Sequence, residues 1–394
     1  MARTPEQHLA EIRRHLGTRP TTTMGLIDAA RYQATAAQDV VAEFASPRFD
    51  NSQMDGYALS VLQVGATPGQ FRVGPTIPAG TDPDYVYPNG ITNAIVPIMT
   101  GAKLPRGTAG IVPIEDCQPA FFSEEGAFIQ VPVMQPGQFM RTTGSDIQAG
   151  DVVVKAGTRV TPAVVATLAS QGCGGLEVYR PGRIVTVTGG AEIGVNGAAA
   201  IPDANEPMLE ALAHRYGIDV VSHVRTDDDP ARLKSDLENI VAEYAPDAIV
   251  TSGGISHGKY EVVRQVLERS GWFGHVDQQP GGPQGLSTIA HTPVISLPGN
   301  PISTLVSFRL FVAPVLGHAP KPFEAKLTEG RRGLLDRDQF LRGRLIHDSG
   351  SVLAAPVGGT ESHLISQAVP ADCLIRIPQT ATIPSGGRVE VYPL

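Results

Sequence analysis

The spacing of hydrophobic residues changes several times along this 394-residue chain. Apolar positions at helical spacing predict helices over residues 5–16 and 25–38. From about residue 40 to 180, short apolar and β-branched runs alternate with glycine- and proline-containing turns, which predicts β-rich modules. Within that region, a helix is predicted over 162–172, with Thr161 as its N-cap and a glycine at its end.

After residue 181 the pattern becomes an alternation of strands and helices. Runs such as RIVTVTGG, DAIVTSGG and TPVISLPGN are typical strands that end in glycine-containing turns. Each is followed by a segment with helical spacing, the last being PISTLVSFRLFVAPVLG. Regular alternation of this kind predicts a parallel, doubly wound sheet with helices on its faces. From about residue 325 the short-strand pattern returns, which predicts a small β domain.

These changes divide the chain into four predicted parts, within the two to four domains that this length favours. They are a linker or dimerisation domain from residues 1–45 with 141–180, a β-rich domain over 46–140, a doubly wound α/β domain over 181–324, and a small β domain over 325–394. The predicted fold class is therefore multidomain α/β with β-rich additions.

Composition narrows the class of protein. A hydrophobic content of 42% with 18% charged residues argues against extensive disorder, and a net charge of −8 disfavours a nucleic-acid or anionic-membrane surface. We find no secretory signal and no run of about 18 apolar residues that would predict a membrane span. The cysteines, Cys117, Cys173 and Cys373, are isolated. We therefore expect a cytoplasmic protein with buried thiols, without a disulfide framework or a structural zinc site.

Candidate binding chemistry lies where the predicted parallel strands end. Ligands of open parallel sheets bind beyond the carboxyl ends of the strands, and the turns there span residues 189–192, 203–205, 252–258 and 297–301. Glycines in such turns let backbone N–H groups approach an anion. One glycine turn can serve chain geometry alone, but several on successive strands favour a phosphate-type site. The G-x-G-x-x-G and GxxxxGK[ST] motifs are absent, which disfavours a nicotinamide dehydrogenase or a P-loop ATPase.

Three polar segments in the β-rich part form a second group of candidates. Asp55 lies beside a glycine in DNSQMDGYA, Thr100 ends the strand of AIVPIMTGAKLP, and Asp146 lies between two glycines in RTTGSDIQAGD. Carboxylates on separate loops can share a hard cation such as Mg²⁺. A solvated turn explains Asp55 equally well, and the sequence alone does not show that these groups converge.

Taken together, the motifs resemble those of the molybdopterin molybdenumtransferase family, bacterial enzymes of molybdenum-cofactor assembly related to the gephyrin E domain. The resemblance runs nearly from end to end of the chain. It rests on RFDNSQMDGYA (48–58), IMTGAKLP (98–105), RTTGSDIQAGD (141–151), TSGGIS and HGKYEVV (251–263), LPGNPIS (297–303) and the final small β domain. As an ordered set these motifs are highly specific.

The resemblance implies an elongated homodimer of four-domain subunits. It implies a Mg²⁺-dependent reaction that consumes adenylylated molybdopterin and molybdate and releases AMP and molybdenum cofactor. The site would lie between the α/β domain of one subunit and the MDGYA-bearing domain of the other. The implied partners are small-molecule substrates, with a molybdopterin adenylyltransferase and cofactor-accepting enzymes as further candidates, and neither nucleic acid nor membrane.

The resemblance also assigns roles to residues at matching positions. Catalytic positions fall on Asp55, Thr100, Asp146, Glu192, Asp228 and Glu261. Substrate-binding positions fall on Asp203, Asn205, Ser252, Gly253, Gly254, Ser256, Pro298, Gly299, Asn300 and Pro301. Mg²⁺ is assigned to Asp55, Glu192 and Asp228. Cleavage of a phosphoanhydride requires charge neutralisation and a positioned nucleophile, which suits these residue types.

Two segments depart from the family pattern. The family's TGDEL reads Gly-Gly-Ala191-Glu192-Ile here, and its KPGKP-like segment reads Gln279-Pro-Gly-Gly282-Pro, so two lysine positions are replaced. Glu261 stands where the family has an aspartate. Lost positive charge near an anion weakens binding by roughly 1–3 kcal/mol per contact. A non-catalytic molybdopterin-binding or scaffold paralogue is therefore an alternative.

An unrelated sugar-nucleotide or phosphosugar enzyme ranks last, because it leaves MDGYA and MTGA unexplained. His363, in TESHLIS, is a candidate either for a structural cap or for ligand contact.

Overall fold

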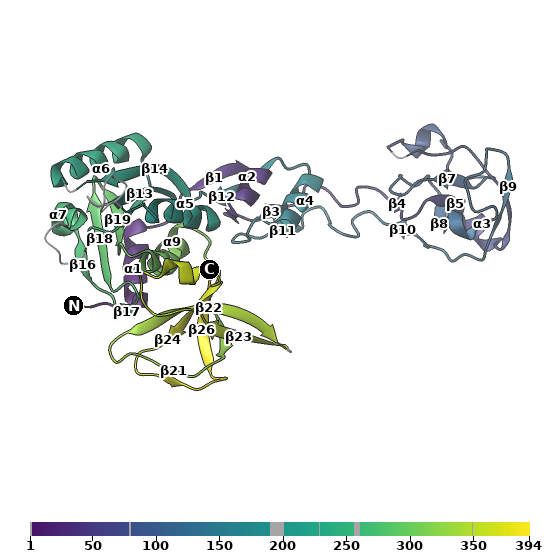
Figure 1. The fold of residues 1–394 in the computed structure, drawn as a ribbon. Coiled ribbons are helices and arrows are strands. Elements are labelled where there is room, and N and C mark those ends of the chain that lie inside the picture. The colour runs from purple at the N-terminus through teal and green to yellow at the C-terminus, as the bar shows by residue number, and fades with distance from the viewer. Residues whose placement is uncertain (1, 79, 190–200, 228, 256–260, 349) are drawn as a thin grey trace. The chain divides into compact units, whose positions relative to one another are not determined.

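The computed structural model describes residues 2–78, 80–189, 201–227, 229–255, 261–348 and 350–394 (Figure 1). The chain divides into two compact units. The first contains Met1–Ala37, Arg159–Pro162 and Glu177–Leu394, and the second contains Gln38–Thr158 and Ala163–Leu176. Among the described residues, no helix combines the length and apolar character that crossing a membrane requires.

The first unit is organised around a six-stranded sheet in the order β14-β13-β15-β19-β18-β16. Its parallel part contains β13 (Arg183–Gly189), β14 (Asp219–Thr226), β15 (Ala248–Ser252) and β19 (Thr292–Leu297). β13, the first of these strands in the chain, pairs with β14 on one side and with β15 on the other. The later strands are therefore added on both sides of β13, and the predicted doubly wound topology is confirmed.

The other edge of this sheet differs from the predicted parallel pattern. β18 (Pro283–Ile289) pairs antiparallel with β19, and β16 (Trp272–His275) pairs antiparallel with β18. A two-residue turn, Ala290-His291, joins β18 to β19, and both residues have positive φ. Such turns usually carry Asn-Gly or Asp-Gly, so this segment lacks the local signal of a hairpin.

Side chains of the parallel strands alternate between two cores. Ile184, Val250 and Ile295 belong to one core, which also holds helices α1 (Pro5–Leu16), α5 (Asn205–Arg215), α8 (Pro301–Ser307) and α9 (Ala313–Leu316). Val185, Ile249 and Val294 belong to the other, with α6 (Pro230–Tyr244) and α7 (Val262–Leu267). Because helices cover both faces of the sheet (Figure 1), nearly all residues of β13, β15 and β19 are buried, their threonines and serines included.

The N-terminal residues also pack in the first unit. Helix α1 begins with a capping box formed by Thr4 and Gln7, and its Ile12 lies in the α/β core. The following β1 (Thr21–Gly25), α2 (Leu26–Arg31) and β2 (Thr35–Ala36) lead into a small sheet in the order β1-β12-β2, with β12 spanning Gly175–Tyr179. The predicted four-part division stays a prediction, although α1 itself is part of the α/β core.

The C-terminal residues form the β-rich structure that the short-strand pattern predicts. Its sheet has the order β17-β22-β23-β20-β26-β24, and β24 pairs again with β22, which closes five strands into a barrel. The strands are β17 (Gln278–Gln279), β20 (Phe323–Leu327), β22 (Asp338–Asp348), β23 (Ser351–Pro356), β24 (Cys373–Ile377) and β26 (Arg388–Pro393). Two short strands, β21 (Arg331–Arg332) and β25 (Thr382–Ile383), pair separately.

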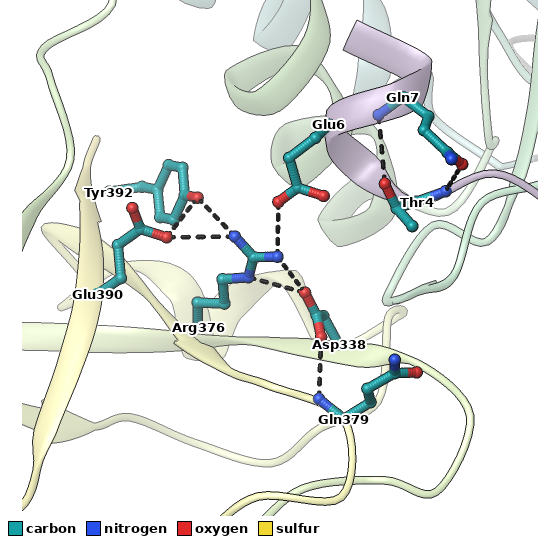
Figure 2. A network of polar contacts seen from close by, with 8 residues as sticks. All are labelled: Thr4, Glu6, Gln7, Asp338, Arg376, Gln379, Glu390 and Tyr392. Atoms are coloured by element: carbon teal, nitrogen blue, oxygen red, sulfur yellow. Dashed lines mark hydrogen bonds and ion pairs between the residues drawn. The ribbon is translucent and has the colours of Figure 1, made fainter.

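An ionic network centred on Arg376 joins this barrel to helix α1 (Figure 2). The Arg376 guanidinium lies 2.6 Å from a Glu6 carboxylate oxygen and 2.5 Å from Asp338 Oδ2, and it also contacts Glu390. Asp338 accepts a further hydrogen bond from the Gln379 backbone N–H at 2.9 Å. Hydrogen bonding and nearby carboxylates outweigh burial and raise the Arg376 pKa. The network therefore fixes the barrel on the α/β core.

The described residues of the second unit form short strands together with the α-helices α3 and α4. A three-stranded sheet has the order β7-β5-β8, and smaller pairs join β6 to β9, β4 to β10 and β3 to β11. The bounds are β3 (Val40–Val41), β4 (Asn51–Ser52), β5 (Gly56–Ser60), α3 (Val61–Gly65), β6 (Gly69–Arg72), β7 (Val96–Ile98), β8 (Thr108–Pro113), β9 (Phe128–Val131), β10 (Met140–Arg141), β11 (Val152–Val154) and α4 (Pro162–Ser170). Strand β5, which carries the GYA of MDGYA, is buried throughout.

The cysteines agree in part with the expectation of buried, unpaired thiols. All three are free, and Cys117 and Cys373 are buried whereas Cys173 is half-buried. Burial raises the pKa of the Cys117 thiol to about 11 and that of Cys373 to about 12. The Cys117 and Cys373 thiols therefore remain protonated and unreactive at neutral pH.

Candidate functional site

A cavity of about 1200 Å³ lies in the first unit, at the carboxyl ends of the parallel strands. Its described lining includes Gly189 at the end of β13 and the turns 252–254 and 298–301 that follow β15 and β19. Because β13 and β15 are adjacent and their helices lie on opposite faces, this is the switch point of the sheet. Ligands of doubly wound folds bind at that point.

The turns after β15 and β19 pack directly against each other. The Gly253 N–H donates to the Leu297 carbonyl at 3.0 Å, and a β-carbon on Gly299 would lie 3.1 Å from Gly253 Cα. A side chain at Gly299 would crowd the neighbouring turn, and Gly253 has a φ of +96°, which residues with side chains rarely adopt, so both positions favour glycine. The arrangement brings two stretches of peptide backbone to one wall of the cavity.

Side chains behind these turns hold them in place. Ser252 is 4% exposed, and its hydroxyl lies 2.9 Å from Thr304 Oγ1 and 3.3 Å from the Pro298 carbonyl. Thr304 in turn donates to the Pro298 carbonyl at 2.7 Å. Asn300 donates through Nδ2 to Ser362 Oγ at 2.9 Å. The predicted binding residues Ser252 and Asn300 therefore have internal partners, and both also line the cavity.

Asp203 and Asn205 connect the start of helix α5 to the same wall. Asp203 Oδ1 accepts the backbone N–H groups of Asn205 and Glu206 at 2.9 and 3.0 Å, and its Oδ2 accepts the Thr188 hydroxyl at 2.5 Å. Asn205 is 7% exposed and donates to the Gly299 carbonyl at 2.7 Å. Both predicted residues line the cavity, but their side chains are also structural ties.

A histidine that the motifs do not include lies beside Asp203. The His223 ring nitrogens lie 2.9 Å from Thr186 Oγ1 and 3.2 Å from Thr188 Oγ1. Ligand atoms of Asp203, Glu206 and His223 fall within 4.8 Å of one another. Burial lowers the pKa of His223 despite the nearby carboxylates of Glu206 and Asp203. The imidazole is therefore neutral at pH 7, as part of a hydrogen-bonded group with the two threonines.

The cavity lining also contains residues from the barrel. Arg337, Glu361, Ser362 and His363 line the cavity. The Ile302 backbone N–H donates to the Ser362 carbonyl at 3.2 Å, which links the barrel loop to the start of α8. Of these residues the motifs indicate only His363. A tertiary contact between two domains brings the others to the site, and it leaves no local signal.

A further part of the cavity lining is the segment 278–283. Residues 278–283 line the cavity. Gln278 and Gln284 are each 1% exposed. Gln284 donates to the Gly281 carbonyl at 2.8 Å and to Ser307 Oγ at 2.7 Å, and Gln278 donates to the Pro280 carbonyl at 3.0 Å. Buried amide side chains therefore fix the backbone of this wall.

The remaining predicted site residues of this unit are placed only in part. Glu261 lines the cavity, next to the start of α7. Glu192, Asp228 and Ser256 lie outside the described residues, as does the substituted Ala191.

In the second unit the structure brings Asp55 and Thr100 together. Asp55 Oδ1 accepts both the backbone N–H and the hydroxyl of Thr100, at 2.6 and 2.7 Å. These bonds, the backbone one first, lower the pKa of the exposed Asp55 carboxyl. Asp50 repeats the arrangement with Thr143, at 2.7 and 2.8 Å, a pair that the motif reading missed. Asp146, which follows closely after Thr143 in the chain, is exposed.

Comparison with known proteins gives consistent matches over the chain. Three family models match: the MoeA N-terminal region (domain I and II) over residues 3–172, a probable molybdopterin binding domain over 184–318, and the MoeA C-terminal region (domain IV) over 324–394. A molybdopterin molybdenumtransferase 2 of Mycobacterium tuberculosis is 34% identical over 383 residues, covering 90% of this chain and 91% of that protein. A molybdopterin molybdenumtransferase of Haemophilus influenzae is 30% identical over 375 residues, covering 91% and 90%.

Solved structures agree in fold. Two crystal structures of a molybdopterin biosynthesis MoeA protein from Pyrococcus horikoshii superpose with TM-scores of 0.76 and 0.70. Their sequence identities are 25% and 22%, and each comparison covers 100% of this chain, with 99% and 100% of the other chain.

Proposed function

Because this chain belongs to the MoeA family of molybdopterin molybdenumtransferases, we propose that it inserts molybdenum into adenylylated molybdopterin. The reaction consumes molybdate, depends on Mg²⁺ and releases AMP together with molybdenum cofactor. The protein works as a cytoplasmic homodimer, in which the Asp55 loop of one subunit completes the cavity of the other. A molybdopterin adenylyltransferase supplies the substrate, and cofactor-dependent enzymes accept the product.

The observation that carries this proposal is the wall formed by the two packed glycine turns. Residues 252–254 and 298–301 present peptide backbone to one cavity at the switch point of the sheet. Backbone N–H groups bind phosphate oxygens without a lysine, and molybdate is likewise a tetrahedral dianion. Since such donors are held by the fold, they need no reorganisation when the phosphoanhydride breaks and charge develops.

The acidic side chains fit a hard cation. Mg²⁺ prefers oxygen ligands, and the Asp55 carboxylate is exposed with both Thr100 bonds on Oδ1. We propose Asp55, Glu192 and Asp228 as the residues that would hold Mg²⁺, with Asp146 and Glu261 as further acidic groups of the site. The ion would neutralise charge on the departing phosphate. Thr100 would keep the Asp55 carboxylate ionised and oriented toward the substrate.

The proposal is tested by assaying AMP release from adenylylated molybdopterin with molybdate and Mg²⁺. Wild-type protein should release AMP and form active cofactor. Asp55→Ala should lose cofactor formation by at least a hundredfold with its melting temperature unchanged, because a carboxylate that contributes charge in the transition state supplies several kcal/mol there. Asp84→Ala, which removes an exposed carboxylate paired with Arg106, is the matched control and should retain activity.

Two results would contradict the proposal. Substrate binding without AMP release in the wild type would favour the scaffold alternative, which the replaced lysine positions at 279 and 282 motivate. Unaltered turnover in Asp55→Ala would instead remove that residue from the site.

A further inference from the structure

A histidine fills the space in the cavity wall where residue 282 has no side chain. Strand pairing places His275 of β16 opposite Pro283 of β18, and the Val276 N–H donates to the Gly282 carbonyl at 2.7 Å. A β-carbon built on Gly282 would lie 2.2 Å from His275 Cε1, 2.8 Å from Nδ1 and 3.0 Å from Nε2. The imidazole therefore occupies the volume that any side chain at 282 would need.

The ring lies on a wall that is otherwise neutral and fixed. His275, Gln279 and Gly282 all line the cavity. The buried Gln278 and Gln284 hold the backbone on either side through bonds to Pro280, Gly281 and Ser307. Because paired strands carry His275 and buried amides hold the wall, the backbone that carries this exposed imidazole has a defined place relative to the cavity.

Basic groups are scarce around this cavity. The described lining contains no lysine, and its only basic side chains are those of His275, Arg337 and His363. Arg337 is already engaged, since its guanidinium makes two contacts with the Asp336 carboxylate, at 2.7 and 2.9 Å. His363 comes from the barrel loop whose Ser362 bonds Asn300 and Ile302. Beside the 278–283 wall, Arg337 precedes Asp338, which pairs with Gln278, so the basic residues there are His275 and the Asp336-bound Arg337.

We propose that His275 is an anion-contacting residue of this cavity and that it replaces, from the neighbouring strand, a basic side chain that Gly282 cannot supply. The inference rests on the proposed function, which gives the cavity a phosphate- or molybdate-bearing ligand. An imidazole has an N–H donor in either charge state, so it can bond an anionic oxygen directly. The absence of a side chain at 282 is then a requirement for this contact, since a larger residue would displace the ring.

The test uses the full-length protein with sodium molybdate and AMP as probes, each titrated by calorimetry, together with KM and kcat for adenylylated molybdopterin. His275→Ala should weaken the affinity for at least one probe roughly tenfold and raise KM with little change in kcat. Gly282→Ala leaves the histidine in place but forces its ring away, so it should weaken the same probe. The double variant His275→Ala with Gly282→Lys should recover affinity, because the lysine enters the space that the ring has left.

His347→Ala removes an exposed histidine from β22 and serves as the control, with unchanged affinities expected. If His275→Ala and Gly282→Ala both bind the two probes within twofold of wild type, the inference about His275 is wrong, while AMP release by the wild type still supports the proposed function. If the variants lose probe affinity but the wild type releases no AMP, His275 contacts an anion and the transferase proposal fails. A wild type that binds neither probe contradicts both.

Discussion

Two aspartates at predicted site positions, Asp203 and Asp55, are held in opposite ways. Asp203 accepts two backbone N–H groups at the start of α5 and the hydroxyl of Thr188, so it ties a helix to the central sheet. Asp55 is exposed, and among the described residues its side chain is held by Thr100, through one of its oxygens. One carboxylate is part of the framework, whereas the other is presented to solvent.

The difference shows that a motif position does not by itself separate a reacting group from a structural one. A carboxylate whose oxygens are already bonded has little capacity left for a metal or a substrate. A carboxylate clamped on one oxygen is oriented yet still available. The contrast predicts that substitution at Asp203 lowers stability and that substitution at Asp55 lowers activity. Four measurements test it.

The largest change is expected for Asp203→Ala, which should lower the free energy of unfolding by about 2 kcal/mol. It removes a helix cap, worth about 1 kcal/mol, and a hydrogen bond of similar value to Thr188. Urea unfolding followed by circular dichroism measures the effect. Asp229 caps α6 in the same way, with bonds to Ala231 and Arg232, so Asp229→Ala should cost about half as much. Equal losses in the two variants would show that the Thr188 bond contributes nothing.

A smaller and pH-dependent effect is expected for His223→Gln. Burial holds the folded-state pKa of His223 below its ordinary value of about 6.5, so the unfolded chain binds a proton first as the pH falls. The wild type should therefore lose stability relative to the variant between pH 7.5 and 5.5, by less than about 1.4 kcal/mol per pH unit. His8 and His318, whose pKa burial lowers to about 3 and about 4, are present in both proteins and cancel in the difference. A pH-independent difference would contradict the neutral imidazole.

Asp55→Ala should change the free energy of unfolding by less than about 0.5 kcal/mol, because exposed polar substitutions away from caps and cores have small effects. The same urea unfolding experiment used for Asp203→Ala measures it. A loss comparable with that of Asp203→Ala would make Asp55 a structural residue and remove the contrast.

The smallest effect is expected for Thr100→Val, which keeps the backbone N–H bond to Asp55 but removes the hydroxyl. The Asp55 pKa, which the Thr100 bonds lower, should rise part of the way toward its ordinary value. At pH values above the ordinary pKa of an aspartate, the wild type should therefore be more stable than the variant. This difference in stability should disappear as the pH falls through the folded-state pKa of Asp55. A carboxyl-detected NMR titration of Asp55 in both proteins measures the shift. An unchanged pKa would mean that the hydroxyl bond is absent in solution.

Prediction from the sequence succeeded where the signal is local. Alternation of buried strands with helices indicated the doubly wound sheet, and glycine turns at strand ends indicated where the cavity lies. It failed at the β16–β18–β19 edge, because Ala290-His291 carries none of the residues that usually mark a hairpin turn. It also missed the Asp50–Thr143 clamp, whose two members are 93 residues apart.

The sequence by itself determined the family and the alternation of the parallel strands with their helices, because those follow from short-range periodicity and from motifs that are continuous in the chain. The tertiary structure alone decided that Asp203 is a structural tie, that barrel residues line the cavity and that the His275 ring lies over Gly282. Each of these depends on contacts between segments that hydrophobic packing and strand pairing bring together, and no local pattern encodes which side chains then meet.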